Sequence, residues 1–408
     1  MTSRIPARAI WALGVTQIIG YGTLYYSFSA VAPTIGQTFG WPPEWIFGAL
    51  TIALLAGGLI SPFSGHLVDR FGAARTMTIG SIIAAASLAL AAVAADGYLF
   101  SAALLLMELA STLVLYAAAF AALVQLGGRT AQRSITHLTL IAGFASTIFW
   151  PLTATLLSIM DWRAVYGIFA AINLLVCAPL HFRLGRMGTG LAGEPAGETL
   201  SDPSAGPEGV MPVNRRRMAF GLLLFGFAIE GFVLSAILLQ IVPILTALGM
   251  GSGMLLVTSL FGPAQVLSRL TNMMFGKDFP ATRLGIVTAL LLPVGIAILA
   301  LTAPSIAWAV AFAVMFGLGS GLTSIISGSL PLELYGRERY GAKLGWLSSA
   351  RQTASAVSPF ILAVVMGQIG VPAALWATAG IGSIAIVVFA AIAVLATHPG
   401  KCRRALLR

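Results

Sequence analysis

Charged side chains are scarce in this chain of 408 residues: Asp, Glu, Lys and Arg together make up 9% of it, whereas 58% of the residues are hydrophobic. Soluble domains carry about 25% charged residues, so the composition excludes a water-soluble protein. The two cysteines, Cys177 and Cys402, and the four histidines are scattered without the spacing of metal ligands. We therefore expect no disulfide, no metal site and no cofactor.

Hydrophobic runs of membrane length, by contrast, occur along the whole chain. A helix needs about 20 apolar residues to cross the hydrocarbon core of a bilayer. Windows of that length predict an all-α membrane protein with twelve transmembrane helices. The predicted spans are residues 10–35, 45–66, 76–95, 98–126, 134–158, 164–183, 217–247, 252–276, 281–301, 305–331, 344–369 and 372–396.

The basic residues indicate which side of the membrane each loop occupies, because Lys and Arg are enriched in cytoplasmic loops. With both termini in the cytoplasm, 20 of the 23 basic residues fall on the cytoplasmic side, and the others are Arg163, Arg269 and Arg351. We therefore expect a multi-pass protein of the bacterial inner (plasma) membrane with cytoplasmic N- and C-termini. The net charge of +10 then reflects topology, and nucleic acid is not an expected partner.

A stretch rich in Gly, Pro, Ser and Glu, residues 184–216, separates the first six predicted spans from the last six. This composition predicts a flexible cytoplasmic linker between an N-terminal six-helix half at 1–183 and a C-terminal six-helix half at 217–408. A shift of 208 residues places the loop 69–75 (DRFGAAR) on the loop 277–283 (KDFPATR) and aligns Phe, Ala and Arg. Parallel repeats of this kind support alternating access in transporters.

The first of these loops carries a signature. Its run from Gly65 to Arg75 (GHLVDRFGAAR) resembles the G-x-x-x-D-R-x-G loop between helices 2 and 3 of the major facilitator superfamily, with alanines at 73 and 74 where basic residues are common. The glycines allow close helix approach. The aspartate can sit at a helix terminus and pair with a cation across the domain interface, which would stabilise an outward-open state. A merely solvated loop is the alternative. The expected gating residues are Gly65, Asp69, Arg70, Gly72 and Arg75.

Four charged residues lie within predicted spans: Glu108, Glu230, Arg269 and Arg351. An arginine at a helix centre costs about 2.5–3.5 kcal/mol on insertion scales, and its guanidinium does not lose its proton. Two such arginines in one half predict a site for a small anion between them. Gln265 lies one helical turn before Arg269, and Ser355 lies one turn after Arg351. Alternatively, each arginine reaches the cytoplasmic surface along its aliphatic stem or pairs with a glutamate.

Polar and aromatic residues of the first half are candidates for the opposite wall of that site. Aromatic side chains with a polar tip can close over a small ligand and donate a hydrogen bond. Each could equally be a helix-packing or interfacial residue. The candidates are Gln17, Tyr21, Tyr25, Tyr116 and Trp150.

The arginine pair, in predicted spans 8 and 11, is similar to the cation pair that binds a carboxylate in oxalate/formate antiporters and their monocarboxylate-transporter relatives. Residues 17–26 (QIIGYGTLYY) and 133–140 (RSITHLTL) resemble a bacterial subgroup that includes arsenite-efflux facilitators. These resemblances imply a secondary active transporter for a small carboxylate or other small anion, working by proton symport, antiport or exchange. Efflux of arsenite driven by the proton gradient is the alternative. We expect a monomer in the lipid bilayer, with a small-molecule substrate and a proton or counter-substrate as partners.

The two glutamates are candidates for carrying a proton, because carboxyl groups inside membranes form proton relays in transporters. Glu230 is the stronger candidate, since its half also contains both arginines, whose charge it could balance while the site is empty. Either Glu230 or Glu108 could instead simply neutralise an arginine. No acidic cluster, His/Cys grouping or nucleophile motif is present in the sequence, so we do not expect an enzyme.

Overall fold

A computed structural model describes residues 5–127, 131–191, 209–251, 253–276 and 279–396. This part of the chain is built from helices and contains no β-strand, which confirms the predicted all-α class. The chain divides into two compact units. Unit 1 comprises Met1–Gly206 together with Arg339–Ser349, and unit 2 comprises Pro207–Glu338 together with Ala350–Arg408.

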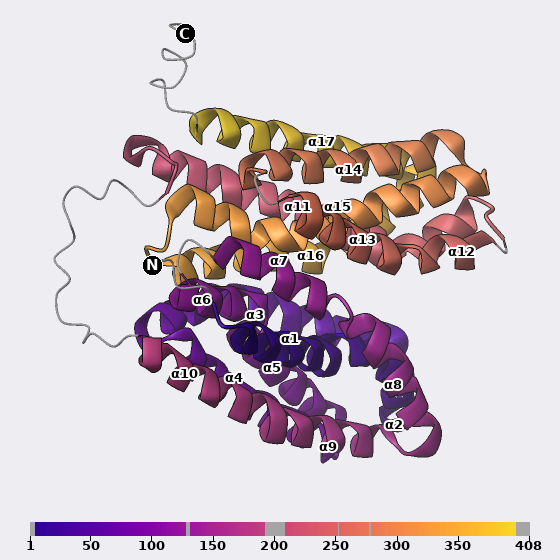
Figure 1. Ribbon diagram of the computed structural model, residues 1–408. Helices are drawn as coiled ribbons and strands as arrows, with labels where there is room; N and C mark the ends of the chain where they lie inside the picture. Colours follow the sequence, from indigo (N-terminus) through magenta and orange to yellow (C-terminus); the bar gives the residue numbers. More distant parts are fainter. Residues whose placement is uncertain (1–4, 128–130, 192–208, 252, 277–278, 397–408) are drawn as a thin grey trace, which may run out of the picture. The chain divides into compact units, whose positions relative to one another are not determined.

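Unit 1 contains the helices α1 (Ala7–Tyr21), η1 (Gly22–Tyr26), α2 (Ser27–Phe39), α3 (Pro43–Phe71), α4 (Ala73–Ala92), α5 (Gly97–Val114), α6 (Tyr116–Gly127), α7 (Ala131–Ala142), α8 (Ala145–Ile159), α9 (Trp162–Ile172), η3 (Asn173–Cys177) and α10 (Ala178–Leu191). Within this unit, α4 packs against α5, α9 and α10 (Figure 1). α3 packs against α5, and α1 packs against α7.

Unit 2 contains η4 (Val213–Arg215), α11 (Arg216–Ala247), α12 (Gly253–Ser259), α13 (Phe261–Phe275), α14 (Ala281–Thr302), α15 (Ile306–Tyr335) and α17 (Val371–Ala396). α16 (Tyr340–Ile369) begins in unit 1 and continues in unit 2. Within unit 2, α14 packs against both α15 and α17, and α13 packs against α15 (Figure 1).

Ten helical segments of the described residues are long and apolar enough to cross a membrane. They coincide with ten of the twelve predicted spans. The predicted spans 10–35 and 252–276 are not among them, although both are helical. The first runs through α1, η1 and α2, and the second is divided at Leu260 into α12 and α13. Twelve spans and cytoplasmic termini therefore stay predictions.

Both ends of the predicted linker, residues 184–216, are ordered parts of the structure, whereas the sequence predicted a flexible segment. α10 continues to Leu191, and residues 192–208 lie outside the described part of the chain. The N–H groups of Val210 and Met211 donate to the carbonyls of Glu333 and Leu334, both at 3.0 Å, and the Met211 side chain is buried. These contacts place the end of the predicted linker against α15, within unit 2.

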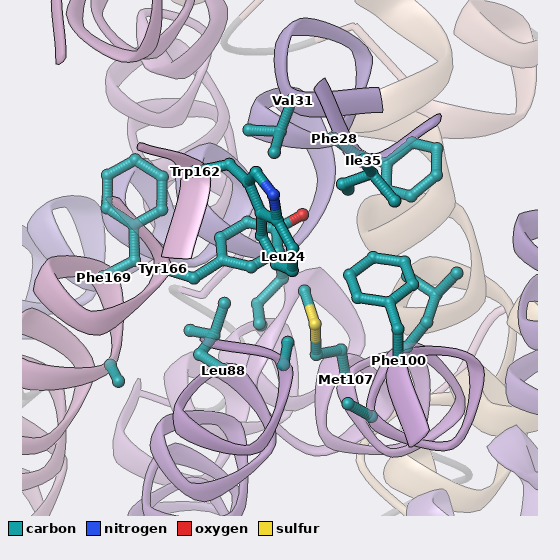
Figure 2. Packing of buried hydrophobic residues seen from close by; sticks show 14 of the residues in the cluster. Leu24, Phe28, Val31, Ile35, Leu88, Phe100, Met107, Trp162, Tyr166 and Phe169 are labelled. Atoms are coloured by element: carbon teal, nitrogen blue, oxygen red, sulfur yellow. The ribbon is translucent and has the colours of Figure 1, made fainter. Parts of the chain in front are cut away.

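Aromatic rings and aliphatic side chains pack together in a core of unit 1 (Figure 2). Phe100 of α5 packs against Trp162 and Tyr166 of α9, with ring centroids 5.7 and 6.5 Å away. The indole N–H of Trp162 donates to Thr38 Oγ1 on α2 at 2.9 Å. Aromatic pairs contribute about 0.5–1.5 kcal/mol each beyond the burial of their area. The cluster therefore stabilises α2, α5 and α9 against one another.

Side chains at equivalent positions cap one helix in each unit. In unit 1, Gln125 Oε1 accepts the N–H of Ala73 at the start of α4 (2.8 Å). In unit 2, Glu333 accepts the N–H of Ala281 at the start of α14 and the hydroxyl of Thr282 (3.1 Å). The shift of 208 residues relates Ala73 to Ala281 and Gln125 to Glu333. The sequence repeat therefore extends to a repeated capping contact.

Replacing the acidic cap tests its contribution to stability. Glu333→Ala should lower the midpoint of thermal unfolding of the purified protein in detergent, because losing a capping side chain costs about 0.5–2 kcal/mol. Glu333→Gln should keep most of the stability, since an amide oxygen caps α4 in the same way. Equal midpoints for the alanine and glutamine variants would show that the cap does not stabilise α14.

Candidate functional site

In unit 2, glycines of α15 let its backbone lie directly against α13, with no side chain between the two helices. A methyl group at Gly321 would lie 2.1 Å from Ser268 Oγ and 2.5 Å from the Gln265 carbonyl oxygen. One at Gly317 would lie 2.6 Å from the Cβ atom of Ala264. Small residues of this kind are typical of closely packed helix pairs in membranes. The approach brings α15 within reach of the polar side chains of α13.

Arg269 is buried at this contact, with only 7% of its surface exposed, which argues against a side chain that reaches the membrane surface. Its Nε–H donates to Ser324 Oγ (3.2 Å) and, with a longer bond, to the Gly321 carbonyl (3.5 Å). One turn earlier, Gln265 Nε2 donates to Ser320 Oγ (3.2 Å). Among the described residues, no carboxylate lies within ion-pair distance of Arg269, and its other N–H groups have no hydrogen-bond partner. The guanidinium of Arg269 is thus held by hydrogen bonds to neutral oxygens, while within the described residues no negative charge balances it.

The α15 serines are contacts of the candidate site that the sequence analysis did not select. Ser324 Oγ also donates to the Gly321 carbonyl of its own helix (2.7 Å). Serines in membrane helices commonly bond their own backbone in this way, so composition alone does not mark them. The available signal was the run of small residues at 317–328 (GLGSGLTSIISG), which predicts a close helix contact.

A second glycine contact in unit 2 joins α11 to α16. A methyl group at Gly231 would lie 2.7 Å from Cγ of Arg351 and 2.9 Å from Ser355 Oγ. Ser355 Oγ donates to the Gly231 carbonyl (3.0 Å), and Ser235 Oγ donates to the Ser355 carbonyl (2.8 Å). These bonds hold the two helices together around Arg351.

Glu230 lies next to this contact and is 1% exposed. Neither of its carboxylate oxygens has a hydrogen-bond partner among the described residues. The stem of the Arg351 side chain lies beside the next residue, Gly231, and its guanidinium is beyond ion-pair distance of Glu230. Glu230, Arg351 and Ser355 thus lie at the contact of α11 with α16, whereas Arg269 and Gln265 lie at the contact of α13 with α15. Within the described residues, the contacts of Arg269 and of Arg351 do not include the other arginine, so the predicted two-arginine clamp stays a prediction.

In unit 1, aromatic residues gather around the π-helical turn η1. Tyr26 contacts Tyr21, Tyr25 and Trp150, with ring centroids 6.4, 5.3 and 5.7 Å apart. Tyr21 also contacts Tyr116 at 4.7 Å, and Trp150 Nε1 donates to the Tyr26 carbonyl (3.2 Å). Four predicted residues are therefore brought together. The sequence analysis missed Tyr26, which joins three of them, because a regular α-helical period does not anticipate a π-helical turn.

Gln17 lies at an interruption of a predicted span. Residues 98–126 form two helices, α5 and α6, because Leu115 between them has an extended backbone (φ −82°, ψ −164°). Gln17 Nε2 donates to the Val114 carbonyl at the end of α5 (2.7 Å). Its Oε1 is buried without a partner among the described residues. Interrupted helices line substrate sites in transporters. Glu108, the second candidate proton carrier, is buried on α5.

The signature loop caps a helix within unit 1. Asp69 Oδ1 accepts the N–H of Gly341 and Asp69 Oδ2 accepts that of Ala342, both at 2.8 Å, at the start of α16. A methyl group at Gly65 would lie 2.3 Å from the Gly341 carbonyl oxygen, so glycine is required there. Gly72 ends α3 with φ of +84°, a left-handed conformation that favours glycine.

The partner of Asp69 differs from the expectation. The aspartate lies at a helix terminus as predicted, but within the described part of the chain no cation lies at ion-pair distance from it. The positive end of the α16 dipole supplies the favourable charge in place of a side chain. Arg70 and Arg75 are exposed, and Arg70 lies over the ring of Phe71 at 5.2 Å.

Removing the Asp69 carboxylate should loosen the start of α16. Two charge-assisted hydrogen bonds are lost, each worth about 1.5–3 kcal/mol. A cysteine placed at the buried position Ala342 reports the change: a membrane-impermeant maleimide should label it faster in the Asp69→Ala background. Arg70→Ala, which alters the neighbouring exposed residue, is the control. Equal labelling rates in all three backgrounds would rule out the capping role.

Comparison with known proteins identifies the family. The sequence pattern of the Major Facilitator Superfamily matches residues 13–359, and the chain therefore belongs to this superfamily. Its family and its apolar helices make it a multi-pass membrane protein of a transporter superfamily, whose members are not enzymes.

Individual relatives are more distant. The chain is 26% identical over 196 residues to the multidrug transporter MdfA of Edwardsiella ictaluri (strain 93-146), a match that covers 48% of this chain and 46% of that protein. The chain thus spans about half the length of this curated relative. The fold is similar to the human organic anion transporter MFSD10 (TETRAN), with a TM-score of 0.73, 14% identity, and 95% and 100% of the two chains covered. It is also similar to FucP, the fucose:proton symporter of E. coli, with TM-scores of 0.69 and 0.64, 13% identity, and 94% and 98% covered.

Proposed function

We propose that this protein is a secondary active transporter of the bacterial inner membrane that moves a small anion, such as a small carboxylate, by alternating access. The observation that carries this proposal is the environment of the Arg269 side chain. It is buried in a membrane-spanning unit, held by neutral oxygens of α15, and without a carboxylate partner among the described residues. An anionic substrate would supply the missing negative charge.

The chemistry of the guanidinium supports a carboxylate over other ligands. Arginine presents five N–H donors in a planar fork that matches the two oxygens of a carboxylate. Within the described part of the chain, only the Nε–H of Arg269 donates a hydrogen bond to the protein. The outer edge of the fork is therefore available for two parallel charge-assisted bonds, which are the strong kind of hydrogen bond in a low-dielectric site.

The proposed substrate contacts in unit 2 are Arg269, Arg351, Gln265 and Ser355. Ser355 is tied to Gly231, so it positions the helix that carries Arg351. In unit 1 the proposed contacts are Gln17, Tyr21, Tyr25, Tyr116 and Trp150. Tyr25 and Trp150 are about half exposed, with 49% and 51% of their surface accessible, which suits side chains that meet a solute.

One observation favours the second candidate, efflux of arsenite. Gln17 Oε1 is a buried acceptor that lacks a donor among the described residues. Arsenous acid is neutral and carries hydroxyl donors, so it would satisfy this atom without needing either arginine. The two candidates therefore make opposite predictions for arginine variants.

Arg269→Gln should reduce transport of the anionic substrate by about 30-fold or more, because losing one partner of a buried charge pair costs about 2 kcal/mol or more. Uptake into proteoliposomes, screened over small carboxylates and arsenite, measures it. Arg283→Gln, which changes an exposed arginine of the same unit, is the matched control. Full carboxylate transport by Arg269→Gln would refute the anion site, and retained arsenite transport would support the alternative.

Coupling is tested with the two buried carboxyl groups. If Glu230 carries the proton, Glu230→Gln should abolish accumulation driven by a pH gradient while substrate-for-substrate exchange continues, since exchange does not require the carboxyl to change state. Glu108→Gln should then leave accumulation intact. The reverse pattern would assign the proton to unit 1. If both variants accumulate substrate with normal pH dependence, neither group couples and the carrier works by exchange alone.

A further inference from the structure

His181 of α10 joins three helices inside unit 1. Its ring nitrogen Nδ1 lies 2.8 Å from Ser81 Oγ on α4, and its Nε2 lies 2.9 Å from Thr16 Oγ1 on α1. All three side chains are buried, with exposed fractions of 2% or less. α10 packs against α4 and against α1 (Figure 1). One imidazole ring therefore links the three helices, and we call Thr16, Ser81 and His181 the polar triad.

The hydrogen bonds of the polar triad identify a neutral imidazole. The hydroxyl of Thr16 donates to the Leu13 carbonyl (3.0 Å), so its oxygen accepts the Nε2–H of His181. A neutral imidazole carries one N–H, so Nδ1 has a lone pair and accepts the hydroxyl of Ser81. Both ring nitrogens are then satisfied. A proton added to Nδ1 would point at the Ser81 hydroxyl hydrogen, and that hydroxyl would have to turn away.

A positive charge on the His181 ring would also have no counter-ion. α10 packs mainly against α1, η3 and α4, and neither these elements nor α10 itself contain an aspartate or a glutamate. An unpaired charge in a buried, low-dielectric environment is strongly unfavourable. The closed triad therefore accommodates the neutral ring only. The other ionisable side chains of the four elements are Arg8, Arg75, Arg183 and Arg186, which are exposed, and the neutral Tyr21 and Cys177.

The second half of the repeat shows that this packing does not require polar side chains. The shift of 208 residues relates α1, α4 and α10 to α11, α14 and α17, which pack together within unit 2. It places the polar triad on Leu224, Ala289 and Phe389, which are apolar. Phe389 is 1% exposed and packs against the ring of Phe227, with centroids 5.7 Å apart. A titratable ring in unit 1 therefore adds a property that the packing of these helices does not need.

We propose that the polar triad is a pH-sensitive switch: the neutral His181 ring holds α1 and α10 against α4, and a proton taken up by the ring releases this contact. An imidazole in water takes up a proton near pH 6.5. Acidification below that point therefore favours an open form, in which the ring reaches water, over the closed form. The inference goes beyond the proposed transport function and does not depend on the identity of the solute.

The switch acts on the part of α1 that carries a candidate substrate contact. Gln17 follows Thr16 directly and donates to the Val114 carbonyl at the end of α5, so release of Thr16 would change how α1 presents Gln17. Ser81 lies about 12 Å along α4 from the start of the helix at Ala73, next to the signature loop. In the predicted topology this is the cytoplasmic side, so the switch would respond to the acidity of the cytoplasm.

A buried thiol next to the polar triad allows the switch to be tested. Cys177 lies about one turn before His181 and is 2% exposed, and Cys402→Ser leaves it as the only thiol of the full-length chain. The rate at which N-ethylmaleimide labels Cys177 is measured from about pH 8 to about pH 5. Dividing it by the rate for the denatured protein at the same pH removes the pH dependence of the thiol itself. We expect this ratio to be constant above about pH 7 and to rise about tenfold for each pH unit below about pH 6.

Two variants assign the effect to the ring. His181→Gln keeps a donor and an acceptor but does not titrate, so its labelling ratio should not change with pH. His66→Gln, the same change at an exposed histidine that contacts the Pro62 carbonyl, should behave as the unmodified protein does. A constant ratio in the unmodified protein, or the same rise in His181→Gln, would overturn the inference.

A further variant decides the question if His181→Gln does not fold, as judged by gel filtration. Replacing His66, His137 and His398 by glutamine leaves His181 as the only histidine of the chain. The rise of the labelling ratio at acidic pH should persist in this protein, and its loss would overturn the inference. None of these results depends on the anion site, which is tested separately through Arg269.

Discussion

The burial of an arginine charge inside a membrane transporter is the constraint on which the arrangement of unit 2 depends. An ion removed from water must be compensated, at a cost of several kcal/mol if it is not. At Arg269 the compensation within the described chain is partial, because a serine hydroxyl and a carbonyl hold one edge of the guanidinium. A carboxylate partner would stabilise the empty protein more, but it would occupy the group that an anionic solute needs.

Glycine residues make these contacts of the arginine side chains possible, because they let neighbouring helices come close. Gly321 lets the backbone of α15 come within bonding distance of α13, and Gly231 leaves space for the stem of Arg351 beside α11. Gly65, at the end of α3, likewise leaves space for the backbone at the start of α16. At Gly321 and Gly231, a side chain of the neighbouring helix donates a hydrogen bond to the glycine carbonyl. A single methyl group at any of these positions would force two helices apart.

Most of the helices could be predicted from the sequence, because a membrane-spanning helix is recognised by the apolar character of about twenty residues taken together. A few polar residues within such a stretch do not change the prediction. The Gly65–Arg75 signature and the two arginines within apolar runs were likewise visible in the sequence. The interruption at Leu115 was not, since one extended ψ angle leaves no periodic trace. The contact of Arg269 with Ser324 was also hidden, because it joins helices 55 residues apart in the chain. Tyr26 was missed because a π-helical turn changes the face on which it lies.

The two capping side chains, Gln125 and Glu333, differ in charge, and this gives the two halves of the repeat different helix caps. Gln125 and Glu333 occupy equivalent positions and accept equivalent N–H groups, but one cap is an amide and the other a carboxylate. Dissolved salt screens interactions between partly exposed charges and dipoles and leaves neutral hydrogen bonds nearly unaffected. We therefore expect the start of α14 to respond more strongly to ionic strength than the start of α4, although both helices begin with the same kind of capping contact.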